Sequence, residues 1–173
     1  LTLAACAGGG QRGVTGPGYH GGAVPQLGDR KPHTWLGGHP YDNPVHGIDI
    51  SRWQGSIDWQ RVRRSVVSFV FIKATEGTSY VNEHFLSDVH AAQAAGLVVG
   101  TYHYARPAGD ARLQAAHYAA TLAAAPQHSL PPVLDIEVTE GLDPAQMQQW
   151  VGEFLAETEH LTGRVPMIYT YSY

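Results

Sequence analysis

The sequence predicts an α/β protein built around a parallel β-sheet. From residue 45 onward, short apolar runs alternate with segments of helical periodicity. The apolar runs contain hardly any polar residue, which is typical of strands that are buried on both faces of a parallel sheet. No hairpin turn is evident between them, so each strand is expected to reach the next through a helix, as in repeated βαβ units.

We expect five strands, each rich in β-branched or aromatic residues. They are residues 47–51 (GIDIS), 66–72 (VVSFVFI), 96–104 (GLVVGTYHY), 132–137 (PVLDIE) and 165–170 (VPMIYT).

The first two helices are expected at residues 58–62 and between residues 82 and 95. Ser56 is the expected cap of the first helix, and Asn82 can cap the second. In the second helix the apolar residues share one face, and Gly96 ends the helix. This predicted face contains Phe85, Leu86, Val89 and Ala92.

Two further helices are expected at residues 111–125 and 143–163. The last starts at Asp143-Pro144, a cap followed by proline in the first turn, and stops near Gly163. Core packing is the expected role of Trp59 and Trp150. The predicted face of residues 111–125 contains Leu113, Ala116, His117, Ala120 and Ala124.

Two parallel architectures fit this order of elements, an open doubly wound sheet and a closed barrel. Neither of the glycine-rich phosphate loops GxGxxG and GxxxxGK[ST] follows any strand, so nucleotide binding has no support. A complete β/α barrel needs roughly 250 residues. The chain has 173 residues and stops just after the fifth strand, so we expect a barrel that is cut short.

The composition limits the classes of partner that we expect the protein to bind. The formal net charge is −4 with no basic run, which argues against a nucleic-acid surface, and no apolar stretch reaches membrane-spanning length. The single cysteine, Cys6, follows Leu3-Ala4-Ala5, which resembles a lipobox. We therefore expect residues 1–5 to be a signal-peptide remnant, Cys6 to be lipidated, and residues 6–44 to be a Gly/Pro-rich linker before a domain at 45–173.

Acidic side chains gather where the predicted strands end, the usual place for chemistry in parallel α/β folds. Asp49 ends the first strand, and Asp135 and Glu137 end the fourth. Residues two apart on a strand point to one side, so Asp135 and Glu137 are expected to form a pair that resists double ionisation. Such a pair suits general acid catalysis, although a divalent-cation site and a solvated strand end remain open alternatives.

Aromatic residues lie at the same strand ends. Aromatic rings pack on the apolar faces of sugars, while sugar hydroxyl groups hydrogen-bond to carboxylates, so these positions are candidates for substrate contacts. The candidates are Trp53, Glu76, Tyr102, Tyr104, Tyr169 and Tyr171.

Five blocks in order resemble glycoside hydrolase family 25, the Chalaropsis-type lysozymes. They are residues 47–51 with 53–55 (WQG) and 57–59 (IDW), residues 69–77 (FVFIKATEG), residues 96–104, residues 132–137 and residues 166–170 (PMIYT).

This resemblance implies an irregular TIM-like barrel with five β/α units followed by antiparallel strands, truncated here after the fifth strand. It also implies N-acetylmuramidase activity on peptidoglycan without a cofactor or metal. On matching positions, Glu137 would protonate the leaving oxygen. Asp135 would stabilise positive charge or orient the substrate's acetamido group, and Asp49 would shape the pocket. A further late-strand acid of the family would lie beyond Tyr173.

Two rival hypotheses remain. The first is a catalytically inactive, glycan-binding envelope lipoprotein of the same fold. The second is a metal-dependent polysaccharide deacetylase, which needs histidine ligands, and only His103 lies at a strand end. In the preferred hypothesis the protein is a monomer at the bacterial cell envelope, and a lipid anchor is its only membrane contact.

Overall fold

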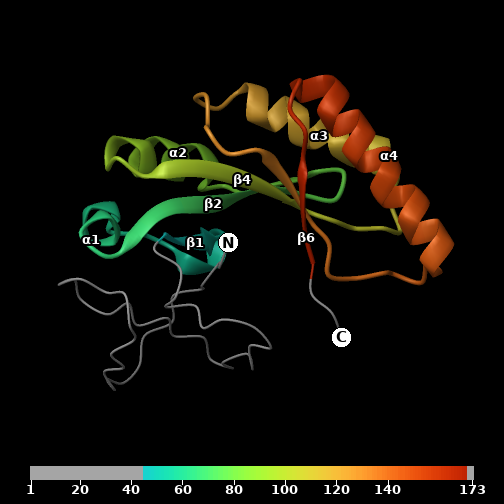
Figure 1. Ribbon diagram of the computed structural model, residues 1–173, viewed down its shortest axis with the longest axis horizontal. Coiled ribbons are helices and arrows are strands. Elements are labelled where there is room, and N and C mark those ends of the chain that lie inside the picture. Colours follow the sequence, from blue (N-terminus) through green and yellow to red (C-terminus); the bar gives the residue numbers. More distant parts are fainter. Residues whose placement is uncertain (1–44, 171–173) are drawn as a thin grey trace, which may run out of the picture.

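The structure, a computed structural model, describes residues 45–170. The predicted lipidated Cys6, the predicted linker and Tyr171 therefore lie outside the described residues. The described chain forms one strongly twisted, mainly parallel sheet with helices packed against it (Figure 1).

The parallel strands stand in the order β1-β2-β4-β5-β6. Their bounds are β1 His46–Ile50, β2 Val67–Glu76, β4 Val98–Tyr104, β5 Pro132–Asp135 and β6 Met167–Tyr169. All five predicted strands are therefore present in a parallel arrangement, which confirms the α/β class. Within residues 45–170 the sheet has β1 and β6 at its two edges and is not closed.

One short strand contradicts the expected absence of hairpins. β3 (Tyr80–Val81) pairs antiparallel with the end of β2, joining Glu76 to Tyr80. The turn between them contains Gly77 at φ +56°, a backbone conformation that suits glycine. β2 is consequently longer than the predicted run of residues 66–72.

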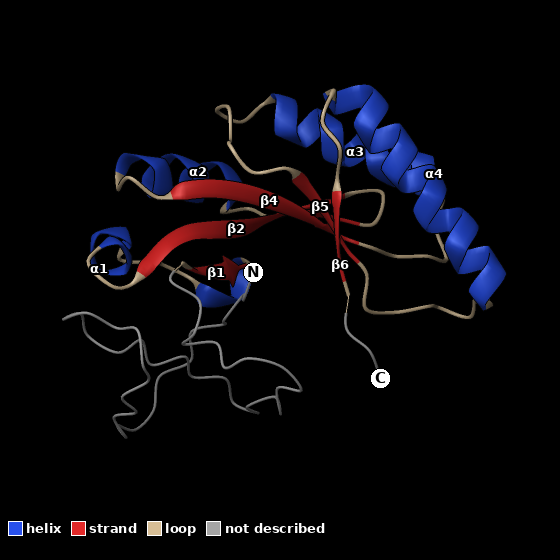
Figure 2. Cartoon of the chain, in the orientation of Figure 1, coloured by secondary structure: helices blue, strands red, loops and turns tan. Residues whose placement is uncertain are grey.

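In the described part of the chain four α-helices connect the strands. Of these, α2, α3 and α4 lie together on one side of the sheet (Figure 2). None of the described helices combines the length and hydropathy of a membrane-spanning segment. The helices are α1 Trp59–Arg63, α2 Phe85–Ala94, α3 Ala111–Ala123 and α4 Pro144–Thr162, with a 3₁₀ turn at Arg52–Gln54.

Local hydrogen bonds set the helix ends. The start of α4 is as predicted, because Asp143 accepts from the backbone N–H groups of Ala145 and Gln146 and Gly163 ends the helix. The predicted cap of α1 is wrong: Asp58, rather than Ser56, accepts from the N–H of Arg61. In α2 the helix begins after His84 without a side-chain cap.

The predicted apolar face of α3 is wrong. Leu113 is 62% exposed, and the buried positions of this helix lie two residues before the predicted ones. The buried set includes two polar side chains, Gln114 and Tyr118, which apolar periodicity does not identify. The prediction that Trp59 and Trp150 belong to the core is confirmed.

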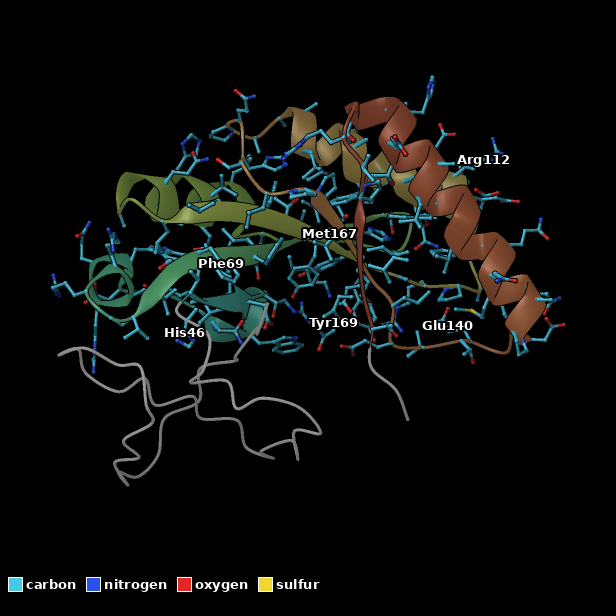
Figure 3. The ribbon with its side chains drawn as sticks, viewed as in Figure 1. His46, Phe69, Arg112, Glu140, Met167 and Tyr169 are labelled. Atoms are coloured by element: carbon cyan, nitrogen blue, oxygen red, sulfur yellow. The ribbon has the colours of Figure 1, made fainter. Side chains whose placement is uncertain are left out.

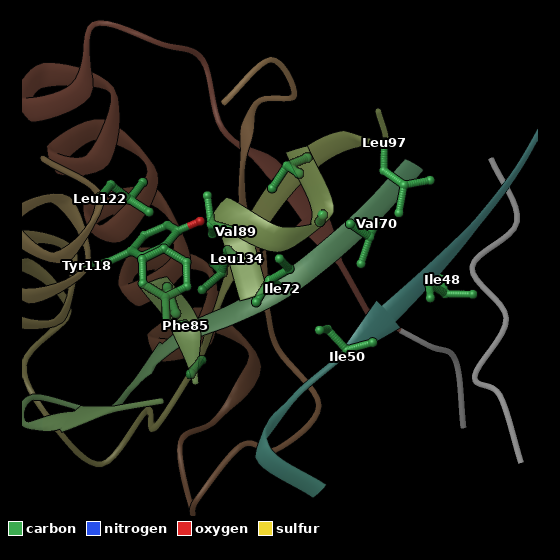
Figure 4. Close-up of a cluster of buried hydrophobic side chains, with 14 of the residues drawn as sticks. Ile48, Ile50, Val70, Ile72, Phe85, Val89, Leu97, Tyr118, Leu122 and Leu134 are labelled. Carbon is green, nitrogen blue, oxygen red and sulfur yellow. The ribbon is translucent and has the colours of Figure 1, made fainter. Parts of the chain in front are cut away.

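Alternation along the strands divides the interior into two clusters. On β2, Val70, Ile72 and Ala74 face the helices in the larger cluster, part of which is shown in Figure 4. Phe69 and Phe71 face the opposite side, where their rings meet edge to face at a centroid distance of 6.0 Å. We call these sides the helix face and the cleft face.

The helix face also holds a buried polar group. His103 is fully buried and stacks on Phe154 at a centroid distance of 5.0 Å. Its Nδ1 lies 2.8 Å from Thr75 Oγ1, and its Nε2 lies 3.0 Å from Gln114 Oε1. Burial lowers the pKa of His103 to about 4.

The cleft face depends on a glycine. A Cβ built on Gly100 would overlap the ring of Phe71 and lie 3.0 Å from the Cβ of Leu130. Gly100→Ala should therefore lower the free energy of unfolding by about 1–3 kcal/mol, measured by chemical denaturation. Gly152→Ala in α4 is the matched control. Its Cβ meets nothing within 4 Å and should stabilise the helix, so equal effects would contradict the prediction.

Candidate active site

The carboxyl ends of the parallel strands open onto a cleft of about 240 Å³ on the cleft face. The three predicted acids reach it from two parts of the sheet: Asp49 from β1, and Asp135 and Glu137 from the end of β5. The complete lining is Asp49, Phe71, Tyr102, Val133, Asp135, Glu137, Met167, Ile168 and Tyr169.

Strand register explains this convergence. Asp49 pairs with Phe71, and Asp135 lies between Tyr104 of β4 and Tyr169 of β6. All of these residues occupy alternate positions that face away from the helices. Figure 3 shows Met167 and Tyr169 on β6, with Tyr169 nearer the carboxyl end of this strand.

Asp135 is the most buried acid of the cleft. It is 9% exposed, and its Oδ1 has no hydrogen-bond partner among the described residues. Burial, followed by the charge of Glu137, raises the pKa of Asp135 to about 7, although Lys73 opposes the shift. A neutral carboxyl group at this position is therefore available as a hydrogen-bond donor in mildly acidic solution.

Glu137 is only partly buried. Burial and then the charge of Asp49 raise its pKa, and Lys73 again acts in the opposite direction. Because Glu137 in turn raises the pKa of Asp135, the two carboxyl groups lose their protons in separate steps. Between these steps the remaining proton lies mainly on Asp135. Glu137 can act as a general acid while it is protonated, and its raised pKa extends the pH range in which it is.

Tyr102 lies beside all three acids. Burial, and then the charges of Asp49, Asp135 and Glu137, raise its pKa well above the usual range. The phenol therefore stays protonated and can donate a hydrogen bond into the cleft.

A second pocket, of about 450 Å³, flanks the cleft at the same end of β1, β2 and β4. Trp53, Glu76 and Tyr104, three of the predicted substrate contacts, line this pocket rather than the cleft itself. Trp53 is 77% exposed. The lining of this flanking pocket is Ser51, Arg52, Trp53, Lys73, Glu76, Tyr80, Tyr104 and Arg106.

Glu76 is the centre of an ion-pair network in the flanking pocket. It binds Lys73 Nζ at 2.6 Å and also accepts from Arg106, which reaches Glu140 at 3.2 Å. Burial alone would raise the pKa of Glu76, but the hydrogen bonds from Lys73 and Arg106 outweigh it and lower the pKa. Glu76 is thus an ionised carboxylate, not a proton donor.

An irregularity in β2 makes the Lys73–Glu76 pair possible. The pairing with β4 shifts register between Lys73 and Thr75, so a bulge interrupts the alternation. Residues three apart on a regular strand point to opposite faces, whereas here both charged side chains line the flanking pocket.

The sequence did not identify Arg52, Tyr80 or Arg106 as site residues. Tyr80 comes from the unpredicted hairpin, and Arg106 comes from the loop after β4. The one feature of the sequence that could have identified these three residues is their position shortly after the ends of predicted strands. His103, in contrast, faces the helices, hydrogen-bonded to Thr75 and Gln114, and does not line the cleft. Within residues 45–170 no group of three or more His, Cys, Asp and Glu side chains could hold a metal ion.

A parallel α/β sheet that gathers paired carboxyl groups and aromatic rings at the carboxyl ends of its strands is typical of glycoside hydrolases. Comparison with known proteins specifies the family. The chain belongs to the glycosyl hydrolases family 25, whose family model matches residues 48–173.

Individual relatives agree with this assignment. The chain is 40% identical over 135 residues to Lysozyme M1 of Streptomyces globisporus, covering 73% of this chain and 46% of that protein. It is 35% identical over 139 residues to the N,O-diacetylmuramidase of Chalaropsis sp, covering 73% of this chain and 65% of the relative. The chain thus spans about half the length of the first of these relatives and just under two thirds of the second.

Solved structures give the same family and fold. The bacterial lysozyme from Streptomyces coelicolor aligns with a TM-score of 0.66 and 38% identity, over 74% of this chain and 63% of the lysozyme. The family GH25 lysozyme from Aspergillus fumigatus aligns with a TM-score of 0.65 and 38% identity, over 72% of this chain and 64% of that chain. These alignments are consistent with a curled parallel sheet that corresponds to part of the family fold.

Proposed function

We propose that the full-length protein is a lysozyme, which hydrolyses the β-1,4 bond between N-acetylmuramic acid and N-acetylglucosamine in peptidoglycan. The observation that carries this proposal is the meeting of Asp49, Asp135 and Glu137 in one cleft, where burial raises the pKa of both members of the pair. Membership of family 25 and the likeness to lysozymes support the same activity.

In this mechanism Glu137 protonates the leaving glycosidic oxygen, because it is the more accessible member of the pair. Asp135 is largely protonated below its pKa of about 7, which favours the role of orienting the acetamido group through a hydrogen bond. Asp49 completes the acidic pocket, and its charge helps Glu137 to keep its proton.

The aromatic side chains position the glycan. Tyr102 and Tyr169 line the cleft, while Trp53 and Tyr104 line the flanking pocket, so the proposed contacts extend along the strand ends. We assign Tyr171 and Glu76 to the same binding surface. In the full-length protein the sheet would form part of an irregular β/α barrel of five units followed by antiparallel strands.

Mass analysis of the products tests this function. The full-length protein, incubated with purified peptidoglycan, should release muropeptides with N-acetylmuramic acid at the new reducing end. Reducing ends on N-acetylglucosamine would contradict the assigned bond. Binding to peptidoglycan without any release would favour the alternative, a catalytically inactive glycan-binding envelope lipoprotein.

The motif Leu3-Ala4-Ala5-Cys6 supports a further proposal, a lipid anchor that holds a monomeric protein at the cell envelope. Two acyl chains on the cysteine would retain the protein in membranes, since each buried methylene contributes about 0.8 kcal/mol. In a bacterial host that expresses the protein with its native leader, Cys6→Ser should move it from the membrane fraction to the soluble fraction. Cys6→Ser protein that stays in the membrane fraction would contradict the anchor.

A further inference from the structure

The flanking pocket carries an excess of positive charge. Three basic side chains line it, Arg52, Lys73 and Arg106, against one carboxylate, that of Glu76. The neighbouring cleft has the opposite character, with three acids and no basic residue in its lining. A chain with a formal net charge of −4 thus concentrates cations in one pocket beside its acidic cleft.

The three cations differ in how far they are neutralised. Lys73 and Arg106 both bind Glu76, and Arg106 also reaches Glu140. Arg52 makes no ion pair within residues 45–170. Its guanidinium instead lies 4.3 Å from the ring centroid of Trp53 and 5.7 Å from that of Tyr80. Aromatic faces hold a cation in place without cancelling its formal charge, so Arg52 keeps its capacity to bind an anion.

Buried contacts anchor the part of this pocket that carries Arg106. Gln114 is fully buried; its Oε1 accepts from the backbone N–H of Arg106 at 3.0 Å, and its Nε2 donates to the carbonyl of Arg106 at 2.7 Å. Since this Oε1 also faces His103 Nε2 at 3.0 Å, His103 donates there and accepts from Thr75 through Nδ1. The loop that carries Arg106 is thus anchored before any ligand arrives.

Lys73 links the two pockets electrostatically. It lines the flanking pocket, with Nζ 4.7 Å from the ring centroid of Tyr104, and its charge opposes the rise in the pKa of Asp135 and of Glu137. A ligand that spans both pockets would place neutral, proton-accepting groups beside the acids and anionic groups beside the cations.

From this charge separation we infer that the flanking pocket binds the carboxylate-bearing peptide substituent of the glycan, with Arg52 as the principal contact. The identity of the polymer rests on the proposed function. A neutral sugar gains nothing from an excess of cations, whereas a peptide carboxylate forms charge-assisted hydrogen bonds with a guanidinium. Arg52 therefore makes the enzyme prefer peptide-substituted strands over bare ones.

Titration calorimetry with two soluble ligands tests this inference on the full-length protein. N-acetylmuramyl dipeptide carries the carboxylate, and an N-acetylglucosamine trimer does not. Arg52→Glu should weaken dipeptide binding several-fold, up to about tenfold, relative to trimer binding, because an attraction at an exposed side chain becomes a repulsion. Arg52→Lys should restore most of the preference, and added salt should weaken dipeptide binding to the wild-type protein.

Arg61→Glu is the matched control, since Arg61 lies on α1, is exposed and lines neither pocket. It should leave the ratio of the two affinities unchanged. An unchanged ratio of dipeptide to trimer affinity in Arg52→Glu would overturn the inference. Displacement of the dipeptide by inorganic phosphate in a competition titration would overturn it as well. The release of muropeptides by the wild-type protein tests the lysozyme proposal separately. If muropeptides are released but Arg52→Glu leaves the ratio of dipeptide to trimer affinity unchanged, only the lysozyme proposal stands. If Arg52→Glu lowers this ratio but no muropeptides are released, only the assignment of the flanking pocket stands.

Discussion

Replacement of Glu137 by glutamine should lower kcat on peptidoglycan by about 10²- to 10⁴-fold, the usual contribution of a positioned general acid. Glutamine keeps the size and the hydrogen-bonding oxygen of the side chain but cannot deliver a proton to the leaving group. Turbidity loss of a peptidoglycan suspension, measured with the full-length protein, gives the rate. KM should change much less than kcat, because binding contacts remain.

Glu83→Gln makes the same chemical change at an exposed position outside both pockets and should keep the wild-type rate. Thermal melting of both variants would show that they are folded. Wild-type turbidity loss by Glu137→Gln would refute the assignment of this residue as the acid.

Asp135→Asn should stabilise the protein at alkaline pH while it lowers activity. The pKa of Asp135 is about 7 in the folded protein and about 3.8 as its ordinary value, so ionisation opposes folding. The wild-type protein should therefore lose stability from this group as pH rises from about 4 to about 7. The asparagine variant avoids this loss, which amounts to at most about 4 kcal/mol at pH 8 and to almost nothing at pH 4.

Urea denaturation at pH 4 and at pH 8 measures the difference. Glu159→Gln, on the exposed side of α4, is the control and should shift both curves little. If Asp135→Asn gave equal changes at both pH values, the buried carboxyl group would not carry the expected cost of ionisation. A variant that keeps full activity would in addition exclude a direct role for Asp135 in substrate binding.

Both the fold class and the cleft could be predicted from the sequence. Continuous apolar runs identified the five parallel strands, and the strict alternation of strands explains why Asp135 was correctly placed beside Glu137. Asp49 could be assigned to the same cleft as Asp135 and Glu137 only because the carboxyl ends of parallel strands lie at one edge of the sheet. That Glu137, Asp135 and Asp49 carry out the chemistry remains a prediction.

The errors have local causes. The hairpin to β3 was missed because a single glycine, Gly77, makes the turn and β3 is only two residues long. The face of α3 was misplaced because the alanine-rich helix carries little periodic signal, and its burial is decided by Gln114 and Tyr118. The bulge at the end of β2, which brings Lys73 and Glu76 together, depends on pairing with β4 rather than on local residue preference.

The buried imidazole of His103 has a consequence for tolerance of acid. Both ring nitrogens are engaged by partners that suit the uncharged ring, and its pKa of about 4 lies below the ordinary 6.5. Proton uptake by the unfolded chain therefore erodes the folded state as pH falls from about 6.5 toward 4, the reverse of the Asp135 dependence. Because Asp135 and His103 titrate over nearly the same pH range with opposite sign, their effects on stability largely cancel between about pH 4 and 6.5, and only the loss from Asp135 continues toward pH 7.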